Sequence, residues 1–159
     1  LSTTRVGMSR VWADGRHETR SVAVPKAGKG GVTDAFRLQR TAAVVEEVCR
    51  FVRSGPTPVA IIYGAVYARF AGSALVLAGL NEVVRYELWR EHLGVAMSVT
   101  DTEARKAVCG RSFRGDGVKG QVAAALRLGG GVFANDDEAD AYVFARYGLG
   151  ASVLTECAA

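Results

Sequence analysis

Carboxylates occupy four of the five positions from 136 to 140, and the chain becomes apolar directly after them. On an α-helix, residues three or four positions apart share a face, so Asp140 lies beside both Asp137 and Asp136. Two carboxylates at that spacing repel each other unless a cation lies between them. A hard divalent ion such as Mg²⁺ suits one or two carboxylates together with a substrate phosphate. The spacing is therefore compatible with a metal site formed by Asp140 with Asp137 or Asp136.

A purely structural role for these acids also stays open. Negative charge near a helix N-terminus is stabilised by the helix dipole, by roughly 0.3–1 kcal/mol for each group. Asn135 or Asp136 could simply cap the helix. Local spacing does not separate the two interpretations.

Positive charge is in modest excess, with 20 Lys and Arg against 16 Asp and Glu, and it is unevenly distributed. Cations recur in a glycine-rich segment before the acidic cluster, where they could bind the phosphates of a polyanion. The candidate contacts are Lys106, Arg111, Arg114 and Lys119, with Arg69 after a predicted strand and Lys26 and Lys29 in an earlier loop. Phe113 could stack on an unpaired base or pack inside its own loop. Lys119 could also be a solvated lysine at a helix start.

Composition excludes several classes of protein. With 159 residues, 49% hydrophobic and 23% charged, the chain is typical of one soluble domain covering 1–159. Apolar stretches such as 73–80 are far shorter than the roughly 18 residues of a membrane span. No secretory leader opens the chain, and no Walker motif predicts a nucleotide cofactor, so we expect a cytoplasmic protein.

Cysteine and histidine give no sign of a site. The three cysteines, Cys49, Cys109 and Cys157, are widely spaced and form no CxxC pair, which argues against structural zinc and fits a reducing compartment. His17 lies beside a predicted turn and His92 closes a predicted helix. We expect structural or surface roles for both histidines.

The first elements that must position these residues are a hairpin and a helix. Two runs rich in apolar and β-branched residues, 6–13 and 18–24, flank Asp14-Gly15 and predict antiparallel strands. A glycine-rich loop follows. Helical spacing then predicts a helix from Asp34, the expected N-cap, to Val52.

Strands and helices alternate in the remainder of the chain. The predicted strands are 59–63 and 94–100, and the predicted helices are 73–93, 103–108, 118–128 and 136–148. Gly94 is expected to end the long helix, and Asp101 or Thr102 to open the next one. This order predicts an α/β fold with a mixed sheet, an antiparallel hairpin followed by parallel strands, and helices on both faces.

In this order, the motifs resemble RuvC-type Holliday junction resolvases, in particular the small phage-type members, within the ribonuclease H-like superfamily. LSTTRVG (1–7) is similar to the end of the family's first-strand motif. Residues 77–110 resemble its long helix, next strand and lysine-containing helix. The basic segment through Lys119 resembles the stretch before the next helix, and NDDEADAYVFAR (135–146) supplies a D-x-x-D pair. The resemblance covers nearly the whole chain.

The resemblance implies a metal-dependent endodeoxyribonuclease that uses Mg²⁺ or Mn²⁺. Such nucleases hold two ions with about four carboxylates, which stabilise the attacking and leaving oxygens. Carried over, Asp137 and Asp140 would be metal ligands and catalytic residues, with Asp136 and Glu138 nearby. Lys119 would lie beside the scissile phosphate as a further catalytic residue.

Two positions depart from the family pattern. The family's first-strand Asp would fall just before Leu1. The family's Glu after a buried strand corresponds to Ile62, and an alkyl side chain cannot bind Mg²⁺. Either the chain has lost activity or the alignment of this strand shifts by a few positions. Glu46 and Glu47 are expected on a solvated helix face and are not substitutes.

We therefore expect a Mg²⁺-dependent nuclease that resolves Holliday junctions. Two strands must be cut symmetrically, so the resemblance implies a homodimer, with helix 73–93 as the expected interface. Gly79 would allow close approach there, or it could pack within one subunit. The alternatives are an inactive junction-binding protein on the same scaffold and a basic enzyme acting on a small metabolite.

Overall fold

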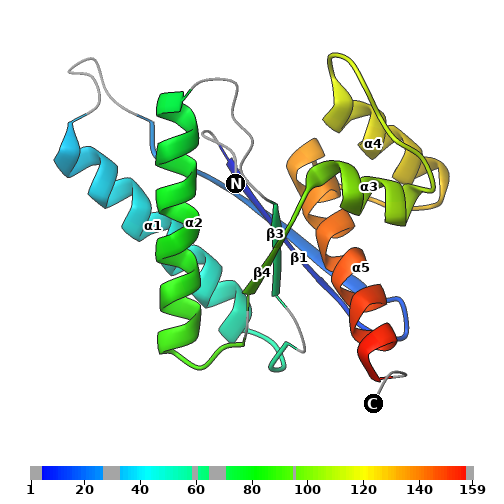
Figure 1. Cartoon of the computed structure of the whole chain (residues 1–159), viewed down its shortest axis with the longest axis horizontal. Coiled ribbons are helices and arrows are strands. Elements are labelled where there is room, and N and C mark those ends of the chain that lie inside the picture. The colour runs from blue at the N-terminus through cyan, green and yellow to red at the C-terminus, as the bar shows by residue number, and fades with distance from the viewer. Residues whose placement is uncertain (1–4, 27–32, 59–60, 65–70, 95, 157–159) are drawn as a thin grey trace.

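The computed structural model describes residues 5–26, 33–58, 61–64, 71–94 and 96–156. Its elements are β1 (Arg5–Val11), β2 (His17–Ala23), α1 (Asp34–Arg53), β3 (Ile61–Gly64), α2 (Ala71–Arg90), β4 (Ala96–Val99), α3 (Asp101–Cys109), α4 (Val118–Leu128) and α5 (Asp136–Glu156). Helices α1 and α2 lie on one side of the strands, and α3, α4 and α5 lie on the other (Figure 1). The predicted mixed α/β arrangement with helices on both faces is confirmed.

The opening hairpin forms as predicted, within a residue or two of the expected bounds. Antiparallel pairing runs from Arg5 opposite Ala23 to Val11 opposite His17. Gly15 closes the turn with φ of 87°, a left-handed conformation that glycine adopts without strain. Asp14-Gly15 is therefore a turn for the reason that the sequence indicated.

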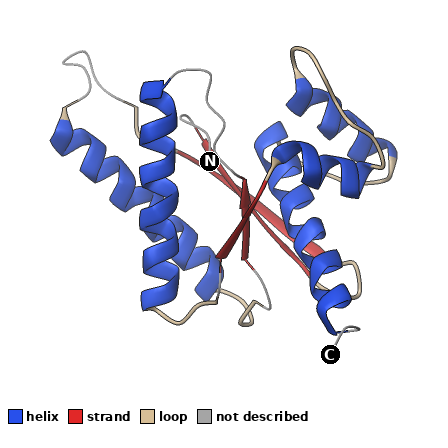
Figure 2. Ribbon diagram, in the orientation of Figure 1, coloured by secondary structure: helices blue, strands red, loops and turns tan. Residues whose placement is uncertain are grey.

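Strands β3 and β4 form a second, parallel pair, with Ile61 opposite Ala96 and Gly64 opposite Val99. Within the described residues, β1 pairs only with β2, and β3 only with β4. In the view of Figure 2 the two pairs run in different directions. One edge of β1 and one edge of β3 are thus left without a described neighbour.

Helices α4 and α5 begin at the predicted residues, whereas α1 and α3 begin one or two residues from the expected positions because threonine hydroxyls cap them. Thr33, not Asp34, caps α1 by accepting the N–H of Phe36 at 3.1 Å. Thr100 caps α3 by accepting the N–H of Glu103 at 3.1 Å, so Asp101 is the first helical residue.

Two helix ends also differ. Helix α2 ends at Arg90, three residues early, where His92 turns the chain with φ of 54° and Leu93 donates its N–H to Leu88. Helix α5 continues past 148 to Glu156. A Cβ at Gly148 would come within 2.6 Å of the Ile62 side chain, so this glycine lets the helix pass close to β3.

Two main hydrophobic clusters hold the layers together. The first joins Val6 and Met8 of β1 to Val44, Phe51 and Leu80 of α1 and α2. The second joins β4, α3, α4 and α5 through Val99, Ala104, Val122 and Val143. Helix α5 also packs on β1, β2 and β3, so it is the element that connects both strand pairs to the helices behind it. No described helix has the length and apolar character needed to cross a bilayer.

Candidate acidic site and basic segment

A cleft of about 400 Å³ runs between the edges of β1 and β3. Successive side chains of a strand point to opposite faces, yet consecutive residues of both strands line the cleft. The cleft therefore follows the strand edges. Side chains of α1 and α2 close one side. Asp137 and Asp140 of α5 and Lys119 of α4 contribute to the other side. Two of the three predicted metal ligands, Asp137 and Asp140, therefore face the same cleft.

The start of α5 is seated directly on β1. A Cβ at Gly7 would come within 2.1 Å of the Asp137 carbonyl oxygen, closer than any side chain can approach. Asn135 caps the helix, because its Oδ1 accepts the N–H groups of Asp137 and Glu138, each at 3.1 Å. The cap and the glycine together fix where the acidic turn lies on the strand.

Lys119 lies between the two predicted ligands. Its Nζ is 2.6 Å from Asp137 Oδ1 and 3.9 Å from Asp140 Oδ2. Lys119 is the second residue of α4, so its partners come from a different helix. The three residues assigned to catalysis from the sequence are therefore neighbours in space.

Asp140 is buried and has a second cationic partner. Arg105 of α3 donates from Nε at 3.0 Å and from Nη2 at 2.9 Å to its carboxylate. Arg105 also lies 3.2 Å from Asp101. Burial raises the pKa of the Asp140 carboxyl above its ordinary value, and the charges of Arg105 and Lys119 oppose that increase.

The other two acids of the cluster point elsewhere. Glu138 is buried and accepts hydrogen bonds from Ser21 Oγ at 2.8 Å and from the Ala134 N–H at 3.0 Å. It ties α5 to β2. The Asp136 carboxylate lies near the first turn of α4, where a Cβ at Gly120 would be 3.6 Å from it. Neither residue lines the cleft, so neither Glu138 as helper nor Asp136 as third ligand is brought to the Asp137–Asp140 pair.

The carboxylates of Asp137 and Asp140 fit one divalent ion. Within the part of the chain that the structure describes, no three His, Cys, Asp or Glu side chains are grouped to hold a metal. Mg²⁺ is often bound by one or two carboxylates, with waters and substrate phosphate completing its shell. The ammonium of Lys119 shows that a single cation can approach both carboxylates from the cleft. The described residues suit one ion, with Lys119 displaced, but not two ions held by four carboxylates.

Ile62 lines the cleft together with Asp137 and Asp140. Its side chain packs against Gly148, two helical turns beyond Asp140. Two residues further along β3, a Cβ at Gly64 would lie 3.1 Å from Asp101 Oδ1. The correspondence between Ile62 and a family carboxylate stays a prediction.

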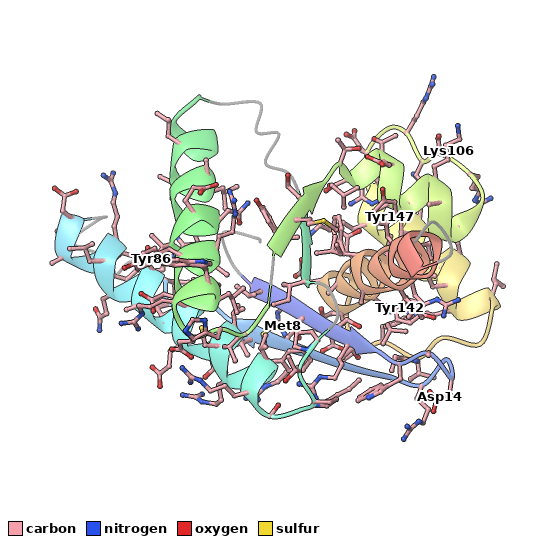
Figure 3. The ribbon with its side chains drawn as sticks, turned by 60° about the horizontal axis from the view of Figure 1, so that its bottom comes forward. Met8, Asp14, Tyr86, Lys106, Tyr142 and Tyr147 are labelled. Carbon is pink, nitrogen blue, oxygen red and sulfur yellow. The ribbon has the colours of Figure 1, made fainter. Side chains whose placement is uncertain are left out.

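The basic segment, residues 106–119, leads directly to the acidic pair. Lys106, Arg111 and Arg114 are exposed, and none forms an ion pair with a described residue. Figure 3 shows Lys106 pointing outward from α3. Many other arginines are already paired, such as Arg50 with Glu46 at 2.6 Å and Arg85 with Glu82 at 2.9 Å. The segment that precedes Lys119 therefore carries three exposed cations for which the structure gives no ion pair.

The remaining candidates have varied positions. Phe113 is half-buried against the second hydrophobic cluster, and the guanidinium of Arg111 lies 4.9 Å from its ring centroid. Lys26 is exposed, whereas Arg69 and Lys29 fall outside the described residues. His17 packs against the rings of Tyr142 and Phe133, which fits a structural role.

Sequence reasoning missed Arg105 and Asp101. Their spacing of four residues on one helix is a usable signal for an ion pair. The contact with Asp140 has no such local signal, because the two residues are 35 positions apart.

Comparison with known proteins identifies the fold. No protein-family profile and no curated protein sequence matches the chain. A structure of RuvC from Thermus thermophilus aligns with a TM-score of 0.59 and 21% identity, over 96% of this chain and 92% of that one. A structure of T. thermophilus RuvC in complex with Holliday junction substrate aligns with a TM-score of 0.57 and 19% identity, over 96% and 97%. The chain therefore has the same fold as these RuvC structures.

Proposed function

We propose that this protein is a RuvC-type nuclease that binds four-way DNA junctions and cuts them with Mg²⁺ or Mn²⁺, in the cytoplasm of a bacterial or phage-infected cell. One observation supports this most strongly. On a RuvC fold, Asp137, Asp140 and Lys119 meet on the wall of one cleft, and the chain segment that precedes Lys119 carries exposed cations.

Each residue of the site would have a separate task. Asp137 and Asp140 would hold the ion, which supplies charge stabilisation during phosphodiester hydrolysis. Lys119 is half-exposed on a flexible stem, so it can turn from Asp137 to a substrate phosphate as a point charge. Lys106, Arg111 and Arg114 would hold the DNA backbone, and Phe113 and Arg69 remain proposed contacts.

We place one further strand in the cleft between β1 and β3. Both strands expose unpaired edges to it, and the buried hydroxyl of Ser9, which lines it, has no described hydrogen-bond partner. A strand from residues preceding Leu1 would pair with both edges, complete the single nuclease domain and deliver the family's first carboxylate. A chain that includes those residues should melt at higher temperature than residues 1–159, and an unchanged melting temperature would argue against the strand.

We propose that α2 forms a homodimer interface. Leu75, Tyr86 and Trp89 are 74%, 56% and 69% exposed and recur at helical spacing, with Val83 on the same face. Gly79 lies on this face with nothing within 4 Å of a Cβ, so it does not serve packing inside the subunit. Figure 3 shows Tyr86 and Lys106 at opposite sides of the molecule, which would leave the basic segments of a dimer free for DNA.

Competition binding tests this function. Labelled four-way junction should be displaced by unlabelled junction far better than by linear duplex of equal length. Affinity should fall steeply with salt, as phosphate contacts require. Equal competition by duplex would contradict the proposal and favour an enzyme acting on some other substrate. A junction-specific protein that never cuts would instead be the inactive binding protein considered above.

A further inference from the structure

The guanidinium of Arg105 is buried and held by two carboxylates. Its residue is only 9% exposed. Nε and Nη2 donate to both oxygens of Asp140, and Nη2 also lies 3.2 Å from Asp101. A buried guanidinium without these partners would strongly destabilise the folded protein. Arg105 should therefore stay bound to Asp140.

Arg105 reaches Asp140 from behind the site. Asp140 and Lys119 line the cleft, whereas Arg105 and Asp101 do not. Lys119 approaches from the open side, with 46% of its side chain exposed. Lys119 and Arg105 therefore differ in how freely each can move away from Asp140. Lys119 can give up its position to an incoming ion, and Arg105 remains as a fixed support on the opposite side of the carboxylate.

We propose that Arg105 is a positioning residue that holds the Asp140 carboxylate in one orientation, so that Oδ2 faces Asp137 and the pair binds a single divalent ion. This inference rests on the metal-dependent function proposed above. Arg105 does not contact the ion or the DNA. It acts through Asp140, and Asp101 acts through Arg105 by holding its Nη2.

The planar fork of arginine is what this role requires. Two parallel N–H donors fix both the position and the rotation of a carboxylate, whereas the compact ammonium of lysine fixes only a distance. Residues that orient a metal ligand in this way typically contribute 10–100-fold to metal affinity. Lysine at position 105 would retain the charge and lose the orientation.

Calorimetric titration with Mn²⁺, in the absence of DNA, tests the inference. Arg105→Lys should weaken Mn²⁺ binding about tenfold. Junction affinity measured in EDTA should stay close to that of the wild-type protein, because Arg105 does not reach the DNA. Arg37→Lys is the matched control, an exposed arginine of α1 outside the proposed sites that should leave Mn²⁺ affinity unchanged. Thermal melting of each variant verifies that it is folded.

A second variant covers the case in which Arg105→Lys does not fold. Asp101→Asn removes the other anchor of Arg105 from a side chain that is 45% exposed, and Mn²⁺ binding should weaken severalfold. Glu103→Gln removes the same charge from the same helical turn without touching Arg105. If each variant binds Mn²⁺ as tightly as its control, the positioning role is wrong while the proposed function stands. If the wild-type protein binds no Mn²⁺, both are wrong.

Discussion

Gly7 of β1 lies directly against the carbonyl of Asp137, so that a Cβ at position 7 would come within 2.1 Å of that oxygen. The first turn of α5, which carries both cleft-facing carboxylates, can rest on the strand only because position 7 has no side chain. The fold and the site therefore depend on the same contact.

Gly7→Ala should destabilise the protein by about 1–3 kcal/mol, since backbone must move to admit the methyl group. It should also weaken Mn²⁺ binding, because α5 would shift away from the cleft. Gly150→Ala is the control, on the same helix with nothing within 4 Å. It should be neutral or slightly stabilising, by up to about 1 kcal/mol. Urea denaturation measures both, and equal stability of the two variants would contradict the close approach.

Neutralising Lys106, Arg111 and Arg114 should reduce the salt dependence of junction binding. Each lost phosphate contact lowers the slope of log K against log salt by about 0.9. The triple glutamine variant should therefore lose about 2.7 from the slope measured by fluorescence anisotropy. Arg16, paired with Asp14 at 2.6 Å in the hairpin turn, provides the control. If Arg16→Gln lowers the slope as much as neutralising Lys106, Arg111 or Arg114 does, the DNA does not bind preferentially at the basic segment.

Ile62→Glu should not create a metal ligand. The half-buried side chain packs against Gly148, so partly burying a carboxylate there should cost about 1–3 kcal/mol of stability. Ile62→Val, which removes only a methyl group, should cost about 0.5–1.5 kcal/mol. If Ile62→Glu is as stable as the wild type and binds Mn²⁺ more tightly, position 62 belongs to the site after all.

Trp89→Lys should convert a dimer to a monomer. It places a charge in the apolar face of α2 where a second copy would bury it. Leu128→Lys changes an even more exposed apolar residue, 90% exposed, on α4 and should leave the dimer intact. Sedimentation velocity distinguishes the two states. A wild-type protein that sediments as a monomer at micromolar concentration would rule out the interface.

Local patterns predicted most of this fold. Asp14-Gly15 identified the hairpin, and the spacing of Asp137 and Asp140 placed both on one face of α5. These features depend on residues close together in the sequence. The N-caps of α1 and α3 differ from the prediction because Thr33 and Thr100, which directly precede Asp34 and Asp101, supply the capping hydroxyls.

Long-range contacts could not be predicted in this way. The bond from Arg105 to Asp140 joins α3 to α5, and the Ser21 contact that turns Glu138 away from the cleft spans 117 positions. Both depend on how helices pack, which a single sequence does not specify. The same limit applies to Ile62, because whether position 62 or 64 faces the carboxylates depends on how β3 lies against α5.

Cleavage of a labelled four-way junction tests the central claim most directly. With Mg²⁺, the wild-type protein should introduce symmetric nicks, and EDTA should abolish them. Asp137→Asn should reduce the rate about a hundredfold while retaining junction binding, since it removes charge stabilisation from the cleft. Asp14→Asn, in the exposed hairpin turn, should cut normally. A wild-type protein that binds junctions but leaves them intact with both Mg²⁺ and Mn²⁺, or an Asp137→Asn variant that cuts at the wild-type rate, would contradict this account.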